Sequence, residues 1–162
     1  MKPSPVQVEV QVDEDFIDQV DGEVLERAVV ATVCHQDVSA PVAMTLVVTG
    51  DGTVRRLNRA YRGVDATTDV LSFGDEGEDD LALPADMPRY LGDVILSFPR
   101  AAAQAREARH PVHAELVLLT VHGVLHLLGH DHAAPAERAA MWMAQAEILD
   151  GLGVSIAKLP ED

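Results

Sequence analysis

The chain has 162 residues, of which 48% are hydrophobic and 24% are charged, the balance of a globular protein rather than of a disordered one. Asp and Glu total 27 against 12 Lys and Arg, and the formal net charge of −15 argues against a general DNA-binding protein or one that binds anionic membranes. The single cysteine, Cys34, excludes an internal disulfide bond and a metal site made only of cysteines. No apolar run has the length of a membrane span, and the first residues alternate where a signal peptide is continuously apolar, so we expect a cytoplasmic protein.

Four segments of the chain have the pattern of β-strands. The first alternates apolar and polar residues with period two, and the other three are short, largely apolar runs. They are residues 6–12, 42–49, 70–73 and 92–98. An acidic segment with glycines and prolines, about residues 74–89, separates the last two and predicts a surface loop.

Five further segments indicate helices. Three of them begin with a proline or directly after one, and the last two end at a glycine. They are residues 22–34, 53–62, 99–109, 112–128 and 135–151. Because the strands come early and the helices late, we expect an α+β fold. It would be a single domain over residues 1–162, with a small mixed sheet of four strands covered by about five helices.

The end of the fourth predicted helix contains the clearest signal for chemistry. His122 and His126 are four residues apart, so they share one helix face. Gly129 can end the helix and turn the chain back, which lets His132 approach the other two histidines. Three neutral imidazoles suit Zn²⁺ and leave a fourth position open for a water whose pKa the ion lowers to about 7. We therefore predict that His122, His126 and His132 bind one zinc ion.

Other histidines in the chain fit this pattern less well. His130 lies in the same segment, and its offset from His132 makes it the less favoured third ligand without excluding it. Three more have no such spacing and are expected at the surface: His35, His110 and His113. A structural zinc site would need a fourth protein ligand, and Cys34 is remote in the sequence.

The same spacing also matches the His-Glu-x-x-His-x-x-Gly-x-x-His pattern of the metzincin proteases. In those enzymes the glutamate is the general base, and the corresponding residue in this chain is Gly123. A glycine cannot accept a proton. A metzincin-like metalloprotease therefore remains only an alternative interpretation of this histidine segment.

A cluster of arginines stands out in this acidic chain. At about 100° per residue, four arginines of the second predicted helix fall on one arc of ~120°, opposite an arc with Val54, Leu57, Ala60 and Tyr61. They are Arg55, Arg56, Arg59 and Arg62. Because guanidinium groups suit phosphate oxygens, a cationic helix face beside an open zinc site predicts hydrolysis of phosphodiesters. The alternative is an ordinary solvated surface. For Arg55 and Arg56 the sequence favours neither this interpretation nor a role in binding phosphate.

Three segments of the chain, residues 57–73, 91–97 and 122–132, resemble the YbeY family of bacterial rRNA maturation factors. Members of that family are single-domain, zinc-dependent endoribonucleases. The resemblance extends from about residue 42 to residue 152, and the histidine segment is its most specific part. The chain departs from the family where Thr67 and Gly74 replace prolines and where His130 replaces an aromatic residue.

The resemblance implies both a function and roles for single residues. The three predicted zinc ligands match those of the family, and Arg62 matches its functionally important arginine, which would stabilise charge in the transition state. Arg55, Arg56 and Arg59 would bind RNA. The implied activity is an endoribonuclease that prefers single-stranded RNA, in rRNA maturation at the 3′ end of 16S rRNA and in ribosome quality control. We expect rRNA and ribosomal subunit components as partners, no membrane or DNA, and a monomer. The non-enzymatic alternative is a ribosome-assembly module whose zinc is structural.

Overall fold

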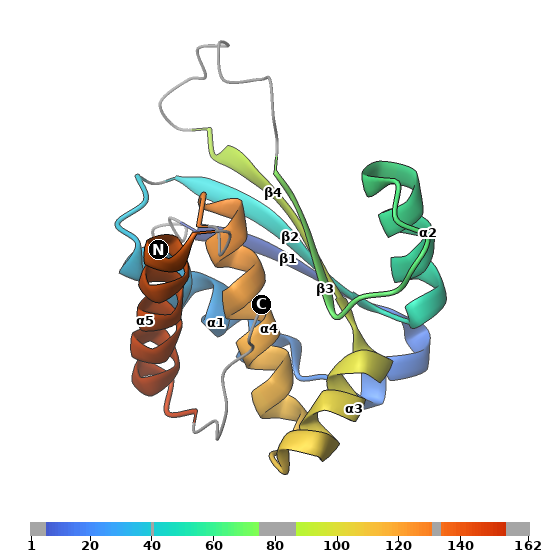
Figure 1. Cartoon of the computed structure of the whole chain (residues 1–162). Coiled ribbons are helices and arrows are strands. Elements are labelled where there is room, and N and C mark those ends of the chain that lie inside the picture. The colour runs from blue at the N-terminus through green and yellow to red at the C-terminus, as the bar shows by residue number, and fades with distance from the viewer. Residues whose placement is uncertain (1–5, 40, 75–86, 131–133, 155–162) are drawn as a thin grey trace.

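The computed structural model describes residues 6–39, 41–74, 87–130 and 134–154 (Figure 1). In these ranges five α-helices and one short 3-10 helix surround a four-stranded sheet, which confirms the predicted α+β fold. Within the same ranges, no helix combines the length and the apolar composition that crossing a membrane requires.

The sheet is mixed and has the strand order β1-β2-β4-β3. Strands β1, β2 and β4 run parallel to one another, and β3 pairs with β4 in the antiparallel direction, so β1 and β3 form the two edges. The bounds are Val6–Val12 for β1, Val42–Thr49 for β2, Val70–Gly74 for β3 and Arg89–Ser97 for β4. All four predicted strands are present, and β4 begins three residues earlier than its apolar pattern indicated.

The predicted helices are all present as well. Their bounds are Gly22–His35 for α1, Asp51–Arg62 for α2, Phe98–Ala108 for α3, Val112–Leu127 for α4 and Pro135–Gly151 for α5. The short 3-10 helix η1, Glu14–Gln19, was not predicted, because this segment has no helical periodicity. It begins at an Asp13 side chain that accepts a hydrogen bond from the Asp15 N–H.

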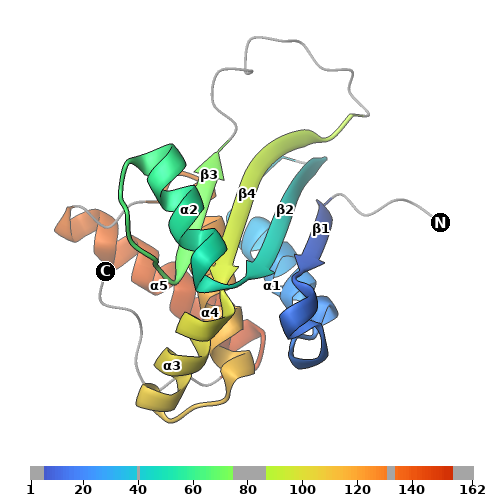
Figure 2. The same ribbon diagram turned by 90° about the vertical axis from the view of Figure 1, so that its right-hand side faces the viewer.

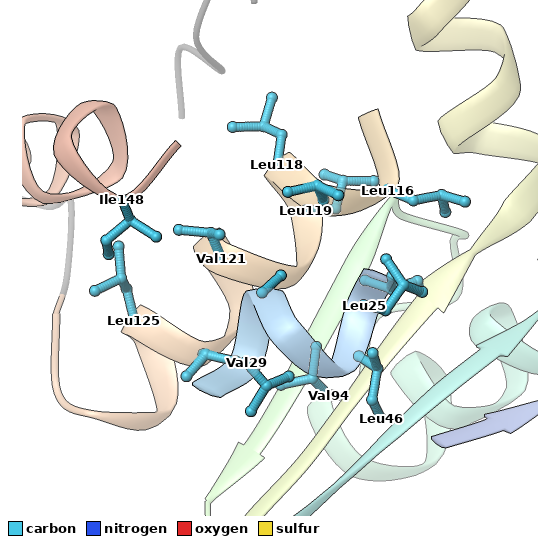
Figure 3. Close-up of a cluster of buried hydrophobic side chains, with 14 of the residues drawn as sticks. Leu25, Val29, Leu46, Val94, Leu116, Leu118, Leu119, Val121, Leu125 and Ile148 are labelled. Atoms are coloured by element: carbon cyan, nitrogen blue, oxygen red, sulfur yellow. The ribbon is translucent and has the colours of Figure 1, made fainter. Parts of the chain in front are cut away.

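Helices cover the two faces of the sheet unequally. Helices α1, α4 and α5 lie on one face, α2 lies on the other, and α3 lies beyond one end of the strands (Figures 1 and 2). The main core fills the space between the sheet and the three helices on the first face (Figure 3). A much smaller apolar cluster lies under α2, with Val54, Leu71 and Ile95 at its centre.

Helix α4 is the most enclosed element of the fold. Every residue from Glu115 to Leu125 is buried. The helix can approach the sheet because residue 123 is a glycine: a Cβ atom there would lie 2.6 Å from Val94 Cγ1 and 3.1 Å from Val70 Cγ2. The Ser72 hydroxyl of β3 donates a hydrogen bond of 2.9 Å to the Gly123 carbonyl oxygen. The edge strand therefore holds α4 at the turn that contains His122.

The three histidines predicted at the surface differ in their exposure. His35 and His113 are exposed as predicted, but the prediction for His110 is wrong. Its side chain is only 6% exposed, and its Nε2 atom lies 2.6 Å from a carboxylate oxygen of the equally buried Glu115. Burial raises the pKa of Glu115.

The predicted acidic loop lies almost wholly outside the described residues, which resume at residue 87 after Gly74.

Candidate metal centre and arginine helix

The two central histidines of α4 converge as predicted. The Nε2 atoms of His122 and His126 lie 3.1 Å apart, and the ring planes are inclined at 72° to each other. Two nitrogens bound at 2.0–2.1 Å to one tetrahedral ion lie about 3.3 Å apart, so the observed spacing fits a shared metal. At this distance a proton or a cation must lie between the two lone pairs to offset their repulsion. The pair is therefore suited to hold a divalent ion.

A residue of α5 fixes the orientation of the first histidine. The Nδ1 atom of His122 lies 2.6 Å from Oε1 of Gln145, and both side chains are buried. Because an amide oxygen only accepts hydrogen bonds, this contact favours the tautomer with the proton on Nδ1, in which Nε2 keeps its lone pair. The sequence analysis missed Gln145. Its position in the apolar stripe of α5, between Met141 and Ile148, was the available signal.

The third predicted ligand, His132, lies outside the described residues, so it stays a prediction. Within the described ranges no three metal-ligating side chains gather in one place. Helix α4 ends at Leu127, and Gly129 follows with a φ of +99°, as expected for a glycine that turns the chain. His130 points toward α1 instead, because its Nε2 atom lies 2.6 Å from Oε1 of Gln36.

All four arginines of α2 are exposed, which confirms the cationic face. The prediction of an apolar arc on the opposite side of the helix is partly wrong. Val54 is buried and Leu57 half-buried, but Ala60 and Tyr61 are exposed, Tyr61 to 72%. The second buried residue of the helix is a polar one, Asn58, whose side-chain amide donates a hydrogen bond of 2.8 Å to the Ala66 carbonyl.

The four arginines differ in their partners. Arg55 donates hydrogen bonds of 2.8 and 3.2 Å to the two carboxylate oxygens of Asp65, which raises the pKa of Arg55 and lowers the pKa of Asp65. Arg56 donates one hydrogen bond of 3.1 Å to the Thr53 hydroxyl. Neither Arg59 nor Arg62 has a hydrogen-bond or ion-pair partner in the described part of the chain. These two guanidinium groups are therefore the most available to a ligand.

The histidine pair and the arginine helix lie on opposite faces of the sheet, with the edge strand β3 between them (Figures 1 and 2). Alternate residues of β3 contact the two sides. Ser72 bonds to α4, whereas the Phe73 ring packs against Tyr61 of α2, with 5.4 Å between the ring centroids. The strand β3 is therefore in contact with both the helix that contains the histidines and the helix that contains the arginines.

Comparison with known proteins places these features in a family. The family described as Endoribonuclease YbeY matches residues 6–153. The chain is 46% identical to the endoribonuclease YbeY of Roseiflexus castenholzii over 96% of this chain and 98% of that protein, and 47% identical to that of Chloroflexus aurantiacus over 91% and 96%. The solution structure of TM1509 from Thermotoga maritima has the same fold, with a TM-score of 0.58, 21% identity, and coverage of 91% of this chain and 88% of that one. The chain belongs to the endoribonuclease YbeY family.

Proposed function

We propose that this chain is a zinc-dependent endoribonuclease that cleaves single-stranded RNA, acts in rRNA maturation at the 3′ end of 16S rRNA, and takes part in ribosome quality control. Membership of the family supports hydrolysis of RNA. The observation that supports the metal is the pair of a buried His122 and a half-buried His126, with Nε2 atoms 3.1 Å apart on one face of α4. His132 is the proposed third ligand.

The donor set fits a zinc ion better than a hard cation. Imidazole nitrogens suit Zn²⁺, whereas Mg²⁺ and Ca²⁺ prefer oxygen ligands. When bound, the ion supplies a Lewis acid and an activated water for attack on phosphorus. His122 and His126 would hold their side of the ion, with His122 inside the buried stretch of α4 and His126 directly after it.

The proposed role of α2 is to bind and polarise the phosphate. Arg62 lies in the last turn of the helix and would donate hydrogen bonds to the non-bridging oxygens, on which negative charge grows in the transition state. Arg59 would contact a neighbouring phosphate. The exposed ring of Tyr61 lies between these positions in the sequence and offers a face on which a base of single-stranded RNA could stack.

Two rival functions meet structural objections. In a metzincin-like protease the general base would occupy position 123, but a side chain there would press into Val94 and Val70 of the sheet. A glutamate at this position would therefore not face the histidines. An assembly module with structural zinc needs a fourth protein ligand, and the exposed Cys34 lies at the end of α1 without a described link to the histidines.

The net charge supports the part of the proposal that concerns DNA and membranes. A net charge of −15 disfavours binding of nucleic acid to the chain as a whole, so we propose that RNA binds at the arginine helix. We propose rRNA and ribosomal subunit components as partners of a cytoplasmic monomer, and no binding to DNA or membranes.

One experiment separates the three functions. The purified protein is analysed for metal, stripped with a chelator and reloaded with Zn²⁺, and each form is tested for cleavage of single-stranded RNA, duplex RNA and a denatured protein. A zinc endoribonuclease contains one zinc per chain, loses cleavage of single-stranded RNA on stripping, keeps its circular dichroism and regains activity on reloading. A protein that unfolds on stripping and cleaves no RNA is the assembly module, and one that cleaves only protein is the protease.

A further inference from the structure

We infer that Gln145 is a positioning residue of the metal centre, which holds the His122 ring in the one tautomer able to bind the ion. The inference rests on the proposed metal function. Gln145 does not touch the ion in this scheme and acts only through His122.

The geometry of the contact supports this role. The 2.6 Å bond joins Nδ1 of His122, 6% exposed, to Oε1 of a Gln145 side chain with no exposed surface. Water therefore does not replace the amide oxygen as the acceptor at Nδ1. If the proton moved to Nε2, it would occupy the lone pair that points at His126, 3.1 Å away. An acceptor at Nδ1 prevents this.

The amide nitrogen of Gln145 is also relevant to the role of this side chain. Nε2 of Gln145 is buried and has no hydrogen-bond partner in the described part of the chain. An unsatisfied buried donor destabilises a fold, and an apolar residue of the same length would remove that cost. A residue needed only for packing would not have to be polar here. A polar side chain at this buried position is explained by the contact of its oxygen atom with His122.

The position of Gln145 is fixed from several directions. Its neighbours on the inner face of α5, Met141, Ile148 and Leu149, are buried in the core. Glu147 of the same helix lies 2.8 Å from Nε2 of His35, which joins α5 to the end of α1. Because these contacts hold α5, they keep the amide oxygen of Gln145 next to Nδ1 of His122.

Three variants of the full chain test the inference. Gln145→Met keeps the length of the side chain and removes the acceptor. Gln145→Glu keeps an acceptor oxygen. Gln36→Met removes the other 2.6 Å contact between a glutamine oxygen and a histidine, at His130, and is the matched control. The zinc dissociation constant of each is measured by competition with a chelator, and circular dichroism checks the fold of each apo form.

We expect Gln145→Met to bind zinc about 10- to 100-fold more weakly than wild type. Gln145→Glu and Gln36→Met should stay within about threefold of wild type or, for Gln145→Glu, bind more tightly, since a carboxylate is a stronger acceptor. Wild-type affinity in Gln145→Met would overturn the inference. So would an equal loss in both Gln145 variants, which would indicate a packing role.

A second measurement needs no variant. Nitrogen NMR shifts of the His122 ring in the metal-free wild-type protein should show the proton on Nδ1, and a proton on Nε2 would overturn the inference. This readout also separates the two proposals. A wild-type protein that shows the Nδ1–H tautomer but binds no zinc refutes the metal-dependent function, whereas one that binds zinc with unchanged affinity in Gln145→Met refutes only the role of Gln145.

Discussion

The two faces of the sheet place their functional side chains in opposite environments. On one face, His122 lies in a helix whose residues are buried for eleven consecutive positions, from Glu115 to Leu125. On the other face, α2 buries only Val54 and Asn58 and exposes all four arginines. The first arrangement restricts the ring of His122 through its packed neighbours, as a metal centre requires. The second keeps cationic groups accessible to a large, flexible anion.

This difference predicts how each face tolerates substitution. Changes on the buried face should alter stability or metal content, because every side chain there has packed neighbours. Changes on the exposed face should alter catalysis or RNA affinity and leave the fold unchanged, since exposed side chains contribute little to stability.

The largest effect is expected for His126→Ala. Two imidazoles hold zinc poorly, so the variant should lose stoichiometric metal, and the loss of several kcal/mol of charge stabilisation should lower cleavage by about a thousandfold or more. Metal analysis and RNA cleavage measure the two effects. His113→Ala, on the exposed side of the same helix, is the control and should behave as wild type. If His130→Ala loses metal while His132→Ala keeps it, the choice of third ligand is wrong.

Arg62→Ala should lower the rate of RNA cleavage without changing the packing or the metal content of the buried face. The expected loss is about 3 kcal/mol of transition-state stabilisation, on the order of a hundredfold in rate, with metal content and thermal stability unchanged. Arg62→Lys should recover only part of the rate, because a point charge lacks the guanidinium fork. Single-turnover cleavage of a single-stranded RNA is the measurement. An unchanged rate would leave Arg62 as an ordinary solvated side chain.

Gly123→Ala should damage the buried face. The added methyl would lie 2.6 Å from Val94 Cγ1, and shifting α4 away from the sheet should cost about 1–3 kcal/mol of unfolding free energy. Gly52→Ala is the matched control on α2, because nothing lies within 4 Å of the added atom. There the substitution should be neutral or stabilising by up to about 1 kcal/mol. Urea unfolding curves of both variants test the contrast, and equal midpoints would contradict it.

Tyr61→Ala should affect the exposed face by a smaller amount. Removal of a stacking ring weakens binding of single-stranded RNA by about 1–3 kcal/mol per base, whereas Tyr61→Phe should keep the affinity. Fluorescence anisotropy with an oligonucleotide and with an abasic oligomer of equal charge measures the difference. The abasic oligomer should bind both proteins alike, and an equal loss with the two oligomers would exclude stacking.

The sequence predicted the buried face better than the exposed one. Alternation and apolar runs located every strand, and the i, i+4 spacing located the histidine pair, because these are local patterns with a fixed geometry. The contact between His122 and Gln145 was missed, since it depends on how α4 and α5 pack together. The burial of His110 was missed because its position next to Pro111 indicated only a helix boundary, not a buried contact with Glu115. The orientation of Tyr61 was missed for a related reason. A helical wheel assigns an apolar face, but only the folded chain shows that Tyr61 contacts the Phe73 ring of β3 and still stays 72% exposed.

The smallest expected effect compares two arginines on the same helix. Arg55 already donates two hydrogen bonds to Asp65, so its charge is locally balanced, whereas Arg59 has no such partner in the described ranges. If both faced RNA equally, their alanine variants would weaken binding alike. We expect instead that Arg59→Ala lowers affinity more than Arg55→Ala does and reduces the slope of log K against log salt by about 0.7, the share of one phosphate contact on a single strand. Titrations at several salt concentrations measure both slopes. Equal slopes for the two variants would show that RNA displaces Asp65 from Arg55, and the ion pair would then compete with the substrate for the arginine face.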